Sequence, residues 1–238
     1  MGVQPSPQET ERLLREFFRD LKPGFFVEVG VSHPTDGSPS WPLEQAGWTG
    51  VLIEPQPDVA ASLVRTRTAK VFAAACSSPE NADDPMTLYI AGPQSTLDLA
   101  RMNARPKTVT VVAARMLDDI LEEAEAPVPV DFVSIAVEGH ELAVLQGFDT
   151  EHWQPRLIAI DDRSSGLAPH WHLKSNGYRL VRRAAGKGWY IPATVPFTMN
   201  WSDRWDILRS YYLGLPFRLV CGAWSGLIGR FRNRAIGK

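Results

Sequence analysis

The sequence is poor in cysteine, in net charge and in long apolar runs, and each shortage excludes a class of protein. Its 238 residues include two cysteines, Cys76 and Cys221, too few for a disulfide framework or a paired-cysteine metal site. This predicts a reducing, cytoplasmic setting, and the first residues lack the basic and apolar segments of a secretory signal. A net charge of −2 argues against a nucleic-acid partner. The sequence contains no run of about 18 apolar residues, so it predicts no membrane span.

Two common phosphate-binding patterns are also missing. The run Gly30-Val31-Ser32-His33 follows the first predicted strand and does not fit the GxGxxG fingerprint of dinucleotide-binding proteins. No Walker A lysine follows it either. An enzyme that uses NAD(P) or a nucleotide sugar on the same kind of sheet therefore stays an alternative that the sequence disfavours.

What the sequence does contain is a regular alternation of buried strands and helices. Apolar residues make up 44 % of the chain, enough for one sizeable α/β domain. The predicted strands are 25–30, 50–54, 70–75, 130–137 and 156–160, with helices between them and a closing hairpin at 178–182 and 189–191. Residues 81–108 are predicted to be mostly loop, with a strand at 86–90, before a helix at 115–124. The alternation predicts a mostly parallel central sheet with helices on both faces, a Rossmann-like α/β fold.

Acidic residues and a glycine close several of the predicted strands. Glu28-Val29-Gly30 ends the first strand, and Glu54 ends the second. Because the carboxyl ends of parallel strands meet at one edge, ligands bind there in open sheets of this kind. An acid after the second strand is where such sites hold ribose hydroxyls, and a glycine allows close approach of the backbone. The sequence therefore predicts a ligand site at this edge.

The end of the strand predicted at 130–137 carries a specific resemblance to a known family. The run Ala136-Val137-Glu138-Gly139-His140-Glu141 resembles a motif of the FkbM family of S-adenosylmethionine-dependent O-methyltransferases. Further matching runs follow the family's order, and together they cover about residues 25–162: Phe26-Val27-Glu28-Val29-Gly30, Gly47-Trp48-Thr49-Gly50, Ile53-Glu54-Pro55, Leu117-Asp118-Asp119 and Trp153-Gln154-Pro155-Arg156.

The resemblance implies a methyl transfer from S-adenosylmethionine to a hydroxyl of a small molecule, a sugar or an oligosaccharide such as a mannoside or polysaccharide precursor. Ala136 stands where the family usually has aspartate, which supports a non-catalytic protein that binds S-adenosylmethionine or a glycan as a further alternative. The glycine-rich run after the first strand is stretched over residues 30–37. The cofactor contacts implied are Glu28, Gly30, Ser32, Glu54, Pro55, Ala75, Cys76 and Ala136.

The chemistry is assigned to residues near the ends of the fourth and fifth strands. His140 is the candidate base for the acceptor proton, with Glu138 as the alternative, because a histidine can take up a proton near neutral pH. The Asp161-Asp162 pair resembles that of macrocin-type sugar O-methyltransferases, which implies a Mg²⁺ site formed with Glu138. The plainer alternative is that one aspartate caps the next turn and the other is solvated.

The predicted domain ends at residue 194, and the chain then changes character. Residues 1–194 form the Rossmann-like domain with its N-terminal helix. Residues 195–238 are predicted to be a helical, aromatic and basic extension that packs on this domain or on a partner subunit. This extension is compatible with an acceptor lid, a homodimer element or a patch that contacts a membrane surface, and self-association is favoured over peripheral membrane contact.

Overall fold

The computed structural model describes residues 7–18, 22–92, 95–99, 105–161, 166–199 and 201–208. The chain divides into two compact units, Met1–Pro196 and Phe197–Lys238. No helix among the described residues has the length and apolar character needed to span a membrane.

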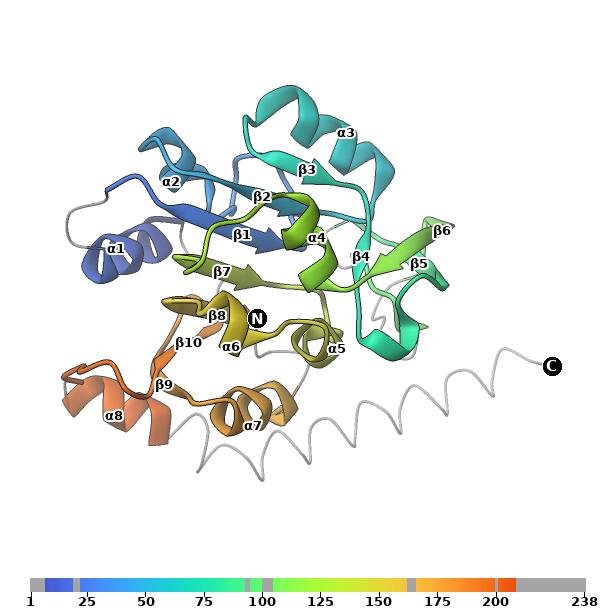
Figure 1. Cartoon of the computed structure of the whole chain (residues 1–238). Coiled ribbons are helices and arrows are strands. Elements are labelled where there is room, and N and C mark those ends of the chain that lie inside the picture. The colour runs from blue at the N-terminus through green and yellow to red at the C-terminus, as the bar shows by residue number, and fades with distance from the viewer. Residues whose placement is uncertain are drawn as a thin grey trace. The chain divides into compact units, whose positions relative to one another are not determined.

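The first unit is built on a seven-stranded sheet, which confirms the predicted Rossmann-like α/β fold (Figure 1). Its strands lie in the order β3-β2-β1-β7-β8-β10-β9, and β3, β2, β1, β7 and β8 are parallel. Strand β10 is antiparallel to both of its neighbours, β8 and β9, as the predicted closing hairpin requires. The bounds are β1 Phe25–Val29, β2 Thr49–Ile53, β3 Lys70–Phe72, β7 Phe132–Ile135, β8 Leu157–Asp161, β9 Tyr178–Ala184 and β10 Lys187–Pro192.

Helices cover both faces of this sheet. The ring of Phe17 in α1 stacks on Trp189 with 6.3 Å between ring centroids, and His170 Nδ1 in α7 lies 3.2 Å from the Tyr190 hydroxyl. Trp189 and Tyr190 are consecutive residues of β10, so their side chains point to opposite faces. The helices of this unit are α1 Pro7–Phe17, α2 Trp41–Gln45, α3 Pro57–Thr66, α4 Leu117–Glu123, α5 Glu141–Gln146, α6 Thr150–Trp153 and α7 Ala168–Ser175, with a 3₁₀ turn at Pro79–Asn81. Helix α8, Trp201–Ile207, belongs to the second unit.

The central strands are short apolar runs because both of their faces are covered. Phe26, Val51, Leu52, Phe132 and Ile158 have no exposed surface. Such double burial is why parallel strands appear in a sequence as continuous apolar segments rather than as alternating ones.

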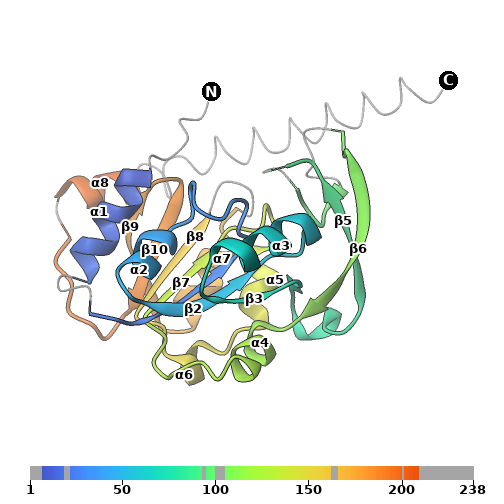
Figure 2. The same cartoon turned by 90° about the horizontal axis from the view of Figure 1, so that it is seen from above.

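A second, three-stranded sheet corrects the predicted strand at 70–75. It consists of β4 (Ala75–Cys76), β6 (Thr108–Arg115) and β5 (Pro85–Ile90), in that order. The predicted single strand at 70–75 is therefore wrong: it ends at Phe72, and Ala75–Cys76 pairs with β6 instead. The view in Figure 2 shows β5 and β6 standing apart from the seven-stranded sheet.

Strand β6 is the largest element that sequence reasoning missed. Its Val109 and Val111 are 53 % and 67 % exposed, so the strand has neither the continuous apolar run of a doubly buried strand nor the usual polar outer face. The predicted helix at 115–124 accordingly begins later, at Leu117. The short α6 was also missed, although the Asp149 side chain caps it by accepting from the amides of Glu151 and His152.

Candidate active site

The strand ends at the carboxyl edge of the sheet form one continuous rim. Beyond the last paired residues, Gly30 N donates to Ile53 O at 2.9 Å, and Ala136 N donates to Val29 O at 3.0 Å. Glu54 N donates to Phe72 O at 3.1 Å, so the same pairing continues past β2. The structure therefore brings Gly30, Glu54 and Ala136 together on one edge, as their positions at strand ends predicted.

At Gly30 the backbone at the end of β1 lies close to the backbone at the end of β7. Its φ is +84°, a conformation that residues with a side chain rarely adopt. A Cβ atom at this position would also collide with the Ala136 carbonyl oxygen. The ends of β1 and β7 thus meet at Gly30 with no side chain between them, and we call this stretch of bare backbone at the rim the glycine cradle.

Glu54 is a buried carboxylate beside this cradle. It is 3 % exposed and accepts a hydrogen bond from Gln56 N at 2.8 Å. Burial raises its pKa to about 7; hydrogen bonds from Gln56 and Val31 oppose this effect, and the charge of Glu28 adds to it. A carboxylate held in this way gains a great deal from any ligand that donates hydrogen bonds to it.

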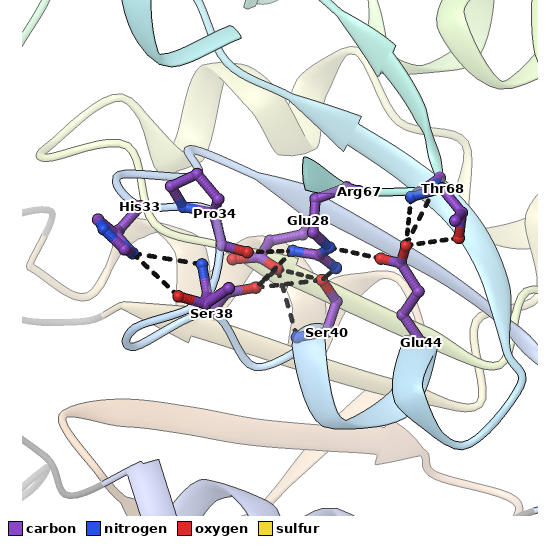
Figure 3. A network of polar contacts seen from close by, with 10 residues as sticks. Glu28, His33, Pro34, Ser38, Ser40, Glu44, Arg67 and Thr68 are labelled. Carbon is purple, nitrogen blue, oxygen red and sulfur yellow. Dashed lines mark hydrogen bonds and ion pairs between the residues drawn. The ribbon is translucent and has the colours of Figure 1, made fainter. Parts of the chain in front are cut away.

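Glu28, by contrast, is occupied by the protein's own loop (Figure 3). Its Oε2 accepts from Ser38 Oγ at 2.7 Å, from Ser40 N at 3.3 Å and from Ser40 Oγ. These contacts hold the stretched segment between β1 and α2 against the sheet. The structure therefore places Glu28 beneath the loop, where it organises the rim.

A fully buried arginine completes this network. Arg67 Nε donates to Glu44 Oε2 at 2.5 Å, and its other nitrogens donate to Pro34 O at 2.9 Å and to Ser40 Oγ at 2.8 Å. Its guanidinium carbon also lies 5.2 Å from the centre of the Trp41 ring. Figure 3 shows the arginine between the two carboxylates. No local sequence pattern predicts this arginine's role, because its partners come from other segments.

Glu44 shares this arginine with Thr68. Burial alone would raise the pKa of Glu44, but the hydrogen bonds from Thr68 and Arg67 outweigh it, so the pKa lies below its usual value. Glu44 therefore stays charged and keeps the arginine in place.

The turn after β7 carries the candidate base. Glu138 and Gly139 both have positive φ, +48° and +102°, so the chain reverses tightly here. The carboxylate of Glu141 fixes this turn by accepting from Gly139 N at 3.0 Å and from Val137 N at 3.3 Å. Glu141 has no exposed surface, and burial raises its pKa, with the Asp161 charge adding to the effect. Sequence reasoning quoted Glu141 but assigned it no role.

His140 follows this turn and is oriented by the second sheet. Its Nε2 lies 3.0 Å from Ser77 Oγ, and Ser77 N donates to Arg115 O at the end of β6 at 2.9 Å. Thr96 Oγ1 donates to Glu138 O at 3.1 Å. The second sheet and its connection are thus joined to the turn at two points. Neither Ser77 nor Thr96 was predicted.

Lys187 brings a positive charge to the same part of the sheet. It begins β10 directly opposite Asp161 of β8, and its Nζ donates to Ser134 Oγ at 2.9 Å. Ser134 pairs in turn with Glu28 of β1. Sequence reasoning missed this residue, because a lone lysine in a hairpin looks like an ordinary turn residue.

Comparison with known families identifies the domain that carries the rim. The model of the methyltransferase FkbM domain matches residues 28–180, from β1 into β9. The chain belongs to the FkbM methyltransferase family. This confirms the resemblance drawn from the sequence. No curated protein matches the chain.

Two of the motifs that carry the family resemblance hold the methyltransferase fold together. Asp118 accepts from Asp149 N at 2.9 Å and from Trp153 Nε1 at 2.8 Å, and so fastens α4 to α6. Burial raises the pKa of Asp118, while these hydrogen bonds lower it in part. The place of these two motifs in the family's pattern is therefore explained by the contacts that join α4 to α6.

The remaining predicted positions of the methyltransferase lie around the rim or outside it. Ser32 lines a hollow of about 410 Å³ between the segment after β1 and helix α3, together with His33, Asp58 and Ser62. Pro55 leads from Glu54 towards α3. Cys76 is buried in the second sheet, and burial raises its pKa to about 12, so its thiol stays protonated.

The predicted magnesium ligands are described only in part. Asp161 ends β8 and is 4 % exposed, and Glu138 lies in the turn after β7, whereas Asp162 falls outside the described residues. Within the described part of the chain, no three His, Cys, Asp or Glu side chains form a group that could hold a metal ion. The described residues therefore do not form the predicted magnesium site.

Proposed function

We propose that this FkbM-family methyltransferase uses S-adenosylmethionine to methylate a hydroxyl oxygen of a sugar or oligosaccharide. The observation that carries the proposal is the glycine cradle at Gly30 beside the buried carboxylate of Glu54. S-adenosylmethionine supplies a methyl group on a positively charged sulfur. Glu54 would accept the ribose hydroxyls, and the bare backbone of Gly30 and Ala136 would lie against the amino-acid part.

His140 is the proposed base for the acceptor hydroxyl. Its ring is oriented by Ser77, which leaves its position set by the protein before any acceptor arrives. Lys187 and Asp161 lie across two neighbouring strands near the same rim and would position acceptor hydroxyls by hydrogen bonds. Glu138, in the same turn as His140, is the alternative base.

Substituting Glu54 by glutamine is expected to move stability and binding in opposite directions. The folded-state pKa of about 7 lies above the usual value of 4.5. Glu54 therefore lowers the stability of the fold as the pH rises from 4.5 to 7, and the loss is complete above pH 7. Glu54→Gln should therefore stabilise the free protein at pH 8 by about 3 kcal/mol, with the gain vanishing below about pH 4.5. The same change should weaken S-adenosylmethionine binding at least about tenfold, because a charged acceptor is lost.

Thermal unfolding at several pH values and isothermal calorimetry measure the two effects. The exposed Glu80 offers the matched control, since Glu80→Gln should alter neither. A Glu54→Gln protein that binds S-adenosylmethionine as tightly as the wild type would contradict the ribose assignment.

Substituting His140 by alanine is expected to lower turnover about 10²–10⁴-fold, the usual contribution of a general base. Cofactor affinity should stay within about threefold, because the backbone cradle is untouched. His152→Ala, at an exposed histidine, is the control. A turnover loss that follows Glu138→Gln instead would assign the proton transfer to Glu138.

The acceptor is found by screening. Calorimetry with S-adenosylmethionine and with NADP⁺ first tests the cofactor, and mass spectrometry then detects a gain of one methyl group on candidate glycans. Binding of NADP⁺ but not S-adenosylmethionine would overturn the proposal. Binding of S-adenosylmethionine without methylation of any glycan or other hydroxyl acceptor would favour a non-catalytic role. Loss of activity with EDTA and its return with Mg²⁺ would establish the metal.

A further inference from the structure

The outward face of the second sheet is apolar. Side chains at alternate positions of a strand point to the same face, and residues directly opposite each other in two paired strands share that face. The pairs Thr87–Val111 and Tyr89–Val109 of β5 and β6 therefore lie on one face. Val109 is 53 % exposed and Val111 67 %, and Thr87 is exposed as well. A sheet face that meets only water usually carries polar side chains, so the two valines indicate a surface that meets another molecule.

The opposite face of the same strands is already covered. Leu88 is 2 % exposed and Val112 7 %, and they form a small core with Ala75 of β4. The whole sheet belongs to the first unit of the chain. It is closed on its inner face by this core, and the outward valines take no part in it.

The outer edge of β5 is partly closed to a further strand. Tyr89 N donates to Thr96 O at 3.0 Å, and Thr96 N donates to Tyr89 O at 3.1 Å. Pro85, which begins β5, has no amide hydrogen to donate. These two features favour association through the face of the sheet over addition of a strand at its edge.

Charged side chains of opposite sign stand at the two ends of the outward face. Asp83 and Asp84 are exposed and precede β5, and the Asp83 amide donates to a carbonyl near the end of β6 at 3.0 Å. Arg105 and Lys107 are exposed and precede β6, and the Lys107 amide donates to the last carbonyl of β5 at 2.8 Å. Because the two strands are antiparallel, the uncharged face lies between an acidic end and a basic end.

We propose that this face is the contact surface between two copies of the chain, stacked sheet against sheet. A symmetric dimer uses the same patch on both subunits. When the two-fold axis lies between the sheets and runs across the strands, the acidic end of each copy lies over the basic end of the other. The valines then pack against each other in the middle. Stacked sheets lie about 10 Å apart, a distance that two facing side chains bridge.

A lipid surface is the competing occupant. A bilayer with anionic headgroups attracts the basic end of the face and repels the acidic end. A second copy satisfies both ends at once, because each end meets its opposite. The distribution of charge therefore favours the dimer.

The test is sedimentation velocity of the full-length protein over a range of concentrations. The contact is small, so we expect a dissociation constant in the micromolar range, about 10 µM at about 0.1 M salt. The affinity should fall several-fold at about 0.5 M salt, because salt screens the charged ends. Lys107→Glu should weaken self-association about tenfold at the lower salt concentration, since it places a negative charge over the acidic end.

Val111 stands in the middle of the face, close to the proposed two-fold axis, where it meets the partner's Val111. Val111→Glu and Val111→Lys should each weaken self-association at least about a hundredfold, because two like charges would meet in an apolar contact. An equal mixture of the two variants should form a dimer again, with an affinity within about tenfold of the wild type, since opposite charges then meet across the axis. This rescue also establishes that both variants are folded.

Val64→Glu is the matched control. Val64 is 65 % exposed, almost the same as Val111, but it lies in α3 and outside the second sheet. This variant should dimerise like the wild type. Thermal unfolding should differ little between the wild type and these valine variants, because both valines are exposed.

Four outcomes overturn the proposal. The first is a wild-type protein that stays monomeric at every concentration. The second is self-association that Val111→Glu leaves intact, and the third is a mixture of the two Val111 variants that stays monomeric. The fourth is a monomer that co-sediments with phosphatidylserine vesicles, which would assign the face to a lipid surface. None of these readouts depends on methyl transfer, so they are independent of the proposed function.

Discussion

Gly30→Ala is expected to abolish S-adenosylmethionine binding and to lower stability. The new Cβ would meet the Ala136 carbonyl, which is backbone and cannot rotate away, so β1 and β7 must separate at the rim. The φ of +84° adds strain of about 1–2 kcal/mol for any residue with a side chain. Affinity should fall more than about a hundredfold, since the displaced backbone is itself the proposed binding surface.

Gly47→Ala separates the two causes. Gly47 has a similar φ of +88° but open space around a Cβ, and it lies just before β2, at the other edge of the sheet. This control should show the conformational strain alone, a fall in melting temperature of about 2–8 °C, with normal binding. Calorimetry and thermal unfolding on both variants decide the matter. Gly30→Ala binding at wild-type affinity would contradict the cradle.

Arg67→Ala is expected to give the largest loss of stability of any variant considered. The arginine side chain has no exposed surface, and its removal leaves Glu44 buried without its cation and Ser40 and Pro34 without a donor. Breaking a buried pair from one side costs about 3–5 kcal/mol. For a chain of this size the melting temperature should fall by about 10 °C or more.

Arg65 provides the control, two residues earlier and exposed. Arg65→Ala should change the free energy of unfolding by no more than about 0.5 kcal/mol. The double variant Arg67→Met/Glu44→Met should recover part of the loss, because no unpaired buried charge remains. Equal melting temperatures for Arg67→Ala and Arg65→Ala would show that the network adds nothing to stability.

The sequence was most informative where burial leaves a continuous pattern. The strand predicted at 25–30 is observed at Phe25–Val29, and that predicted at 156–160 is observed at Leu157–Asp161. Both are covered on two faces, so nearly every residue is apolar. Strand β6 was missed although its residues 108–112 are rich in the β-branched valine and threonine that favour strands.

The site was predictable only for residues whose place along the chain determines their place in the fold. The ends of parallel strands share an edge, so Gly30, Glu54 and Ala136 could be placed together from the sequence. The network of Arg67 and Glu44 could not, since 23 residues separate them and their meeting depends on how α2 and α3 pack. The same holds for His140 and Ser77, which are 63 residues apart.

The pairing of His140 with Ser77 also ties two tasks together. The Ser77 amide donates a hydrogen bond to the end of β6, and the Ser77 hydroxyl lies within hydrogen-bond distance of the His140 imidazole. A displacement of the small sheet would therefore change the orientation of the imidazole. If His140 is the base that we propose, an acceptor or a second copy that bound the exposed Val109 and Val111 of this sheet would also reorient the group that takes the acceptor's proton. Binding at this sheet and the rate of methyl transfer would then be coupled.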